Sequence, residues 1–286
     1  MNHAEQTFVF SCGGESMVGV VAQPPMSGKV GILIVVGGPQ YRVGSHRQFL
    51  HLSRALAAAG YPAMRFDCRG MGDSTGEPRN FESLTEDIAA AIAAFTLNCP
   101  QVERVVLWGL CDAASASLMY WDETRDPRLS GLVLLNPWVR SEATLARAHI
   151  KHYYGQRLLQ VEFWRKMLTG NLGLGRALSG FLGSLKNARQ EKSQGTQDEA
   201  LSFQERMARG FDLFPGPVLL LLSGNDYTAK EFLEAVLADP KWTSALREPR
   251  ITRSDIVGAD HTFSSRAWRE QVENITKEWL DAKVAR

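Results

Sequence analysis

Short apolar runs alternate with helix-length periodic segments along most of this chain, and that alternation limits the possible folds more than any other feature. Residues 31–36 (GILIVV) form a continuous apolar run, as expected for a strand that is buried on both faces. Residues 49–60 then have helical spacing and end in a glycine, a frequent helix stop. Strands and helices in regular alternation build a mostly parallel sheet with helices on both faces. We therefore predict an α/β fold with a mostly parallel central sheet flanked by helices.

The other predicted elements extend the same pattern. An opening hairpin turns at Gly13-Gly14, where two glycines favour a tight reversal. The predicted strands and helices lie at residues 7–12, 17–23, 63–66, 84–97, 105–108, 113–120, 132–136, 217–226, 230–238, 250–258 and 266–283.

The alternation stops after residue 138 and resumes at residue 211. Residues 139–210 have helical periodicity but no convincing strand, so we predict a helical cap inserted into a core of residues 1–138 and 211–286. Between Arg140 and Lys192, ten Lys or Arg residues stand against three Asp or Glu residues. This basic stretch is either a solvated helical face or a rim that attracts an anionic substrate.

Composition narrows the functional classes. Lys plus Arg is 32 and Asp plus Glu is 31, a near-neutral balance that disfavours nucleic-acid binding. The first residues lack a signal-peptide pattern, and no apolar run is long enough for a transmembrane segment. The four cysteines lack the spacing of a zinc site or a disulfide framework. We therefore expect a cytoplasmic protein with reduced thiols, no metal and no cofactor, while its oligomeric state leaves no signal in the sequence.

The segment VVLWGLCDAAS (residues 105–115) places a cysteine between a predicted buried strand and a predicted helix. Small residues two positions to either side, Gly109 and Ala113, allow the close backbone approach that a strained turn requires. The helix that follows points its positive end at the sulfur of Cys111, which favours a thiolate. Cys111 is therefore a candidate nucleophile, and an inert buried cysteine is the alternative.

A candidate acid and a candidate base follow the last two predicted strands. Asp226 comes after residues 218–222, and His261 lies between the final strand and the final helix. In this hypothesis Cys111 attacks an acyl carbon, His261 takes its proton and later activates water, and Asp226 orients the imidazole. Asp112, which can cap the helix start, and Asp260, adjacent to the histidine, are weaker candidates for the acid.

These motifs resemble those of the α/β hydrolases. Residues 109–113 resemble their nucleophile elbow, with cysteine where most members have serine, and the order Cys, Asp, His matches their order of nucleophile, acid and base. The turn RGMGDS (residues 69–74) is also similar to one in that superfamily. GGPQYR (residues 37–42) together with GLCDAAS (residues 109–115) resembles the exosortase A system-associated hydrolase type 1 group, whose members accompany bacterial exopolysaccharide and protein-sorting genes. The resemblance implies an α/β-hydrolase fold and a Cys-His-Asp triad.

The same resemblance implies an oxyanion hole made of two backbone N–H groups. One is the N–H of Asp112, and the other comes from the turn after the strand at residues 31–36. Gly37 stands there in place of the usual histidine, and Pro39 has no N–H to donate. We expect Gln40 to supply the second donor, with Gly38 as the alternative. The candidate substrate-binding residues are Tyr41, Arg42, Tyr153 and Trp164.

The leading functional hypothesis is a hydrolase that cleaves an ester or thioester through an acyl-cysteine intermediate. The basic stretch favours an acyl-CoA or a carrier-bound acyl group over a neutral small-molecule ester. The first alternative is an acyltransferase that uses the same triad with a glycan or small acceptor. The second is a non-catalytic binding module on the same fold.

Overall fold

The computed structural model describes residues 3–26, 28–140 and 201–285. The chain divides into two units, one made of residues 1–139 and 202–286 and the other of residues 140–201. Most of the predicted cap, residues 139–210, therefore lies outside the described residues.

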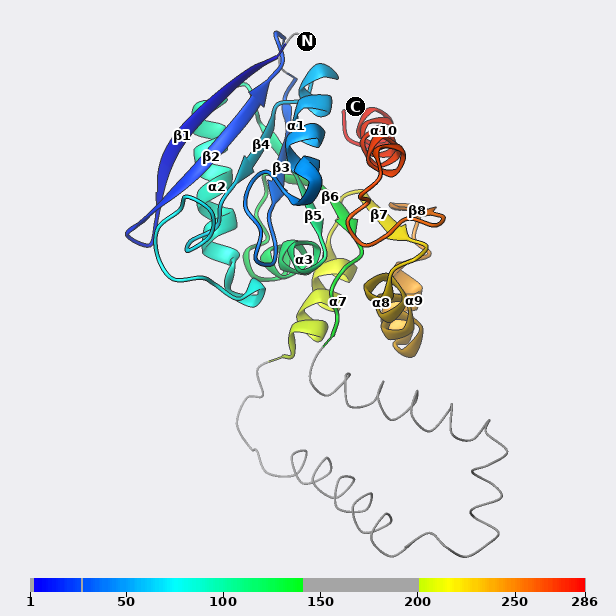
Figure 1. The fold of residues 1–286 in the computed structure, drawn as a ribbon. Helices are drawn as coiled ribbons and strands as arrows, with labels where there is room; N and C mark the ends of the chain where they lie inside the picture. Colours follow the sequence, from blue (N-terminus) through cyan, green and yellow to red (C-terminus); the bar gives the residue numbers. More distant parts are fainter. Residues whose placement is uncertain (1–2, 27, 141–200, 286) are drawn as a thin grey trace, which may run out of the picture. The chain divides into compact units, whose positions relative to one another are not determined.

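An eight-stranded sheet forms the centre of this unit, in the order β1-β2-β4-β3-β5-β6-β7-β8 (Figure 1). The first two strands pair antiparallel as a hairpin, and β2 pairs antiparallel with β4. All remaining neighbours are parallel, as the alternation of strands and helices predicts. The strands are β1 (Ala4–Cys12), β2 (Glu15–Gln23), β3 (Val30–Val35), β4 (Ala63–Phe66), β5 (Arg104–Leu110), β6 (Leu129–Leu135), β7 (Val218–Ser223) and β8 (Ile251–Ile256).

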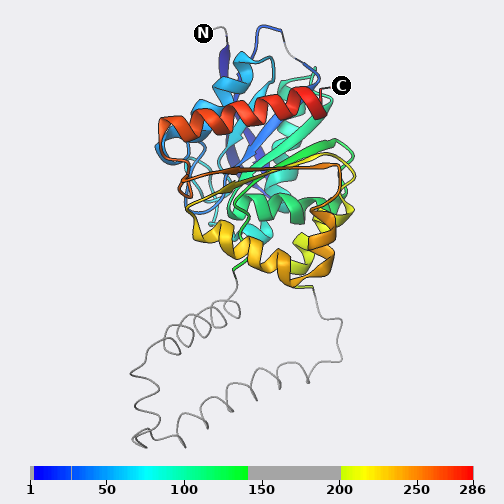
Figure 2. The ribbon, with the colours of Figure 1, turned by 90° about the vertical axis from the view of Figure 1, so that its right-hand side faces the viewer.

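Helices cover both faces of the sheet. One layer consists of α1 (Gln48–Ala58) and α10 (Arg266–Lys283), which contact each other; Figure 2 shows α10 crossing in front of the sheet. The helices of the other layer are α2 (Thr85–Asn98), α3 (Asp112–Thr124), α7 (Phe203–Leu213), α8 (Tyr227–Ala238) and α9 (Pro240–Ala245). The predicted α/β architecture is confirmed.

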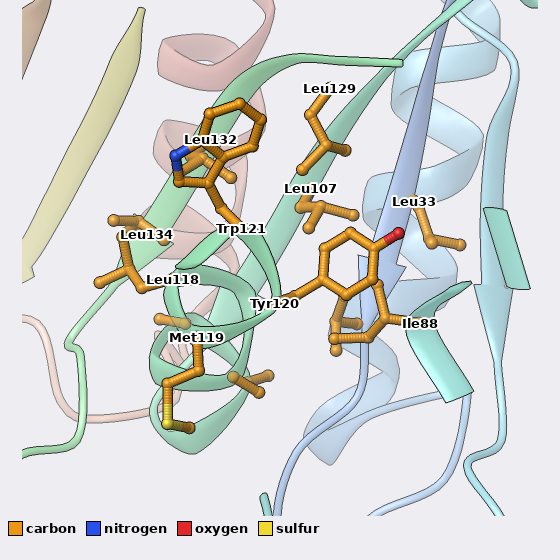
Figure 3. Packing of buried hydrophobic residues seen from close by; sticks show 14 of the residues in the cluster. Leu33, Ile88, Leu107, Leu118, Met119, Tyr120, Trp121, Leu129, Leu132 and Leu134 are labelled. Carbon is orange, nitrogen blue, oxygen red and sulfur yellow. The ribbon is translucent and has the colours of Figure 1, made fainter. Parts of the chain in front are cut away.

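The continuous apolar runs follow from burial on both faces. Along β3, Leu33 belongs to the core under one helical layer, whereas Ile32 and Ile34 belong to the core under the other. All three side chains are fully buried. Figure 3 shows the core that contains Leu33, where leucines from neighbouring strands pack against Tyr120 and Trp121 of α3. An alternating polar residue would face a helix rather than solvent, so the strand sequence has none.

Helix α7 corrects the predicted boundary at residue 210. Residues 202–210 belong to the first unit, because α7 packs on α3. The Arg209 guanidinium makes a bidentate ion pair with the buried Asp122, at 2.6 and 2.7 Å. Gly210 lies so close to α3 that an added Cβ would stand 2.2 Å from the Leu118 carbonyl oxygen. The sequence of α7 is amphipathic like that of a cap helix, so periodicity alone does not distinguish the two.

Within residues 3–26, 28–140 and 201–285, no helix combines the length and the apolar character needed to cross a bilayer. The same part of the chain holds no group of three or more His, Cys, Asp or Glu side chains placed to bind a metal ion.

Candidate active site

Cys111 lies at the junction of β5 and α3, on a strained backbone. Its φ is 62° and its ψ is −124°, a conformation that residues with a Cβ rarely adopt. The strain is held by hydrogen bonds: its N–H donates to the Leu135 carbonyl of β6 at 2.8 Å. Gly109 makes the turn possible, since a Cβ there would lie 2.6 Å from the backbone of Ala113. The small residues of this motif are therefore steric requirements of the turn, which presents the sulfur half-buried at the carboxyl end of β5.

Asp226 and His261 reach the same end of the sheet from β7 and β8. The His261 Nδ1 atom lies 2.9 Å from an Asp226 carboxylate oxygen, and the Cys111 side chain lies beside the imidazole, close enough to raise the pKa of His261. Asp226 is 7% exposed and caps α8, because it accepts hydrogen bonds from the N–H groups of Thr228 and Ala229. The cap holds the carboxylate still, so the imidazole has one preferred orientation. The structure thus brings together the three residues that the sequence nominates as a triad.

The environment of His261 strongly favours its charged form. Its hydrogen bond to Asp226 is the largest cause and that to Cys111 the second, and together they raise the pKa of His261 to about 10 against the opposing effect of burial. Burial raises the pKa of Asp226, but the hydrogen bonds from His261 and from the N–H groups at the start of α8 outweigh this effect. The pKa of Asp226 therefore lies below its ordinary value. Asp226 is therefore ionised and His261 protonated around neutral pH.

Asp260, the weaker candidate for the acid, has different partners. Its carboxylate accepts hydrogen bonds from the N–H groups of Thr262 and Ser264. Its role is to shape the loop that carries His261.

Asn136 is a residue of this site that the sequence reasoning missed. It follows β6 in the left-handed region, with a φ of 43°, and it is fully buried. Its side-chain amide donates to the Ser223 hydroxyl at 2.8 Å and to the His261 carbonyl at 3.2 Å, and its carbonyl accepts from the Ser223 N–H. Asn136 therefore ties the ends of β6 and β7 to the histidine loop. The sequence signal that could have identified Asn136 is a polar residue directly after a buried apolar strand.

Two of the three predicted oxyanion donors have hydrogen-bond partners within the protein. The Gly38 N–H donates to the Asp112 carboxylate at 2.7 Å, and the Gln40 N–H donates to the Gly38 carbonyl at 2.8 Å. The third, the N–H of Asp112, lies beside the carboxylate of its own side chain. The turn after β3 thus lies beside the elbow, as expected, but its polar groups are already engaged.

The predicted substrate-binding residues differ in their surroundings. Tyr41 is 48% exposed. Arg42 lies in ion pairs with Asp67 and Asp73, so its guanidinium anchors the turn to the loop after β4. Its role in substrate binding stays a prediction, as does that of Tyr41. The other two, Tyr153 and Trp164, lie outside the described residues.

The remaining cysteines are poor nucleophiles. Cys12, Cys68 and Cys99 are all buried, and burial raises the pKa of each thiol. Among the four cysteines, Cys111 alone combines partial exposure with a histidine partner.

Comparison with known proteins agrees with this geometry. The model of the alpha/beta hydrolase family matches residues 32–273, most of the chain. The chain therefore belongs to the alpha/beta hydrolase family, and it is an enzyme of the hydrolase class.

Similar proteins include one human sequence and many solved structures. Human Protein ABHD12B is 37% identical over 78 residues, which are 27% of this chain and a fifth of that protein. The esterase Pf2001 of Pyrococcus furiosus has 15% identity and a TM-score of 0.65, over 98% of this chain and 93% of its own. Est1E of Butyrivibrio proteoclasticus, solved with ferulic acid bound, has 15% identity and a TM-score of 0.62, over 98% of this chain and 100% of its own. At these identities the structural likeness concerns the fold.

Proposed function

We propose that this enzyme hydrolyses an ester or thioester through an acyl-cysteine intermediate on Cys111. One observation carries the proposal: at the elbow, the His261 imidazole lies 2.9 Å from the Asp226 carboxylate and beside the Cys111 side chain, and both raise its pKa. This chain of contacts is what an activated thiol nucleophile requires. The basic stretch of residues 140–192 favours an anionic acyl donor such as an acyl-CoA or a carrier-bound acyl group.

The reaction takes two steps. In the first, the Cys111 sulfur attacks the acyl carbon, a C–S bond forms, and the bond to the leaving alcohol or thiol breaks. His261 holds the thiol proton as an imidazolium and delivers it to the leaving group. In the second, a water gives a proton to His261 as its oxygen attacks the thioester carbon. The C–S bond breaks, the acid departs, and the proton returns to the sulfur.

The two causes of the raised pKa of His261 fit these two steps. Before acylation both partners stabilise the imidazolium, which suits an acid that protonates a leaving group. In the acyl enzyme the sulfur is a neutral thioester and its contribution is lost. The pKa of His261 then falls, and the residue becomes a better base for water. Acylation itself therefore switches the histidine from acid to base.

A burst experiment with p-nitrophenyl butyrate and with butyryl-CoA tests this proposal. We expect a burst of leaving group equal to the enzyme concentration, followed by slower steady turnover. The Cys111→Ala variant is expected to show neither phase, and His261→Ala is expected to slow both steps. Steady turnover by Cys111→Ala at the wild-type rate would refute the acyl-cysteine pathway.

A further inference from the structure

The Asp112 carboxylate occupies the position where an oxyanion is expected to bind. It accepts a hydrogen bond from the Gly38 N–H at 2.7 Å, and it lies at the start of α3 beside its own N–H and that of Ala113. The N–H groups of Gly38 and Asp112 are two of the three predicted donors for the negative oxygen of a reacting acyl group. A carboxylate oxygen and such an oxyanion need the same donors, so the two compete for one place.

The surroundings are built to accept this carboxylate. It lies at the first turn of the 13-residue helix α3, where backbone N–H groups favour a negative charge. Gly37 leaves the room that it needs, because a Cβ at that position would lie 1.9 Å from one Asp112 oxygen. Burial raises the pKa of Asp112, whereas the Gly38 N–H, the N–H groups at the start of α3 and the charge of His261 act against that rise. These contacts hold the carboxylate in place in the free protein against the cost of burying its charge.

No other predicted donor is left for the acyl oxygen. The Gln40 N–H, the remaining candidate, donates to the Gly38 carbonyl at 2.8 Å. A substrate carbonyl that enters while Asp112 stays in place would meet a carboxylate instead of hydrogen-bond donors. Acylation consequently requires this side chain to move.

We propose that Asp112 controls access to the oxyanion hole: its carboxylate fills the hole in the free enzyme and must rotate out before Cys111 is acylated. This inference rests on the proposed function, since it concerns the acylation step of that reaction. It assigns to Asp112 a role separate from that of the triad acid Asp226.

An adjoining cavity gives the carboxylate a place to go. A cavity of about 290 Å³ is lined by residues that include Asp112, the Gly37–Gly38 turn, Arg79 and Phe81. Within the described part of the chain, the Arg79 guanidinium has no hydrogen bond or ion pair. Arg79 is thus an available cation in the cavity that Asp112 lines, and we assign to it the role of pairing with the rotated carboxylate.

The test compares two reactions of Cys111 that differ in their need for the hole. Acylation by p-nitrophenyl butyrate develops a negative oxygen, whereas alkylation by iodoacetamide displaces iodide and develops none at an acyl group. Asp112→Ala empties the hole, and Asp112→Asn removes the charge but keeps an oxygen of the same shape in it. Circular dichroism and thermal unfolding establish that each variant is folded.

We expect Asp112→Ala to acylate at least tenfold faster than wild type, with Asp112→Asn in between. Alkylation does not use the oxyanion hole, so it responds to the charge of Asp112 and not to an oxygen in the hole. Because both variants remove that charge, they should be alkylated at rates equal within twofold. Acylation of Asp112→Ala at or below the wild-type rate, with alkylation intact, would overturn the inference while leaving the nucleophile in place. If Cys111 of the wild-type enzyme were neither acylated nor alkylated, the proposed function itself would be refuted.

A double-mutant cycle tests the role of Arg79. Arg79→Gln is expected to slow acylation severalfold in the wild-type background and to have no effect when Asp112 is already alanine. Equal slowing in both backgrounds would show that Arg79 does not receive the carboxylate.

Discussion

Replacing Asp226 by Asn tests the electrostatics of the site quantitatively. The substitution keeps the shape of the side chain and its ability to cap α8, because Asn is as good an N-cap as Asp. It removes the negative charge that lies 2.9 Å from His261. A hydrogen bond to a charged group contributes about 1.5–3 kcal/mol. Since about 1.4 kcal/mol corresponds to one pKa unit, the pKa of His261 should fall by roughly one to two units.

The assay is an NMR titration of the imidazole in protein labelled at histidine, with His261→Asn used to assign the signal. Wild type should titrate near the value of about 10 that its partners impose, and Asp226→Asn should titrate at roughly 8–9. Asp260→Asn is the matched control, because that carboxylate is adjacent in sequence but bonds Thr262 and Ser264 instead. An unchanged or higher pKa of His261 in Asp226→Asn would refute the reasoning, as would an equal shift in the control.

Four further predictions concern the nucleophile, the linkage of charge to stability, the positioning residue Asn136, and the packing at the elbow. Cys111→Ser should remain folded but turn over p-nitrophenyl butyrate at least about tenfold more slowly, because a hydroxyl is a weaker nucleophile than a thiol and a protonated His261 cannot take its proton; equal turnover would contradict a specialised thiol site. The raised pKa of His261 stabilises the folded state most below pH 6.5, and that contribution disappears as the pH rises toward 10. The difference in unfolding free energy between wild type and His261→Asn, measured in urea, should shrink across that range, and a growing difference would contradict the assignment. Asn136→Ala should cost about 1–3 kcal/mol in the same measurement, because it leaves a buried N–H unsatisfied, and it should lower kcat; an effect on neither would remove its positioning role. Gly109→Ala should lose about 1–3 kcal/mol through overpacking, whereas Gly28→Ala, which meets only an ordinary contact at 3.5 Å, should change stability by less than about 0.5 kcal/mol; equal losses would show that the close approach at the elbow is unimportant.

Local sequence patterns were sufficient for the sheet and for most of its helices, although the short α9 (Pro240–Ala245) was not predicted. The run GILIVV has no polar residue because both faces of β3 are buried, and that property is visible without coordinates. Residues 202–210 are different. Their amphipathic pattern indicates a helix, but not which surface it covers, and only the contact with α3 assigns that helix to the core.

The candidate site could likewise be predicted only in part from the sequence. Cys111, Asp226 and His261 each follow a predicted strand, so topology alone brings them to one end of a parallel sheet. The partners of individual N–H groups depend on rotamers and on turn geometry, which no periodicity encodes. For that reason the sequence predicted that Asp112 would cap its helix, but not that its carboxylate would reach the Gly38 N–H.

The position of the acyl group is the most direct test of the central claim. Wild-type enzyme is exposed briefly to p-nitrophenyl butyrate, quenched in acid and digested with trypsin. We expect one butyryl group on the peptide of residues 105–125, with fragment ions that place it on Cys111. A butyryl group on the peptide that contains Cys68, or on a hydroxyl of the 105–125 peptide in an enzyme that still turns over, would contradict it.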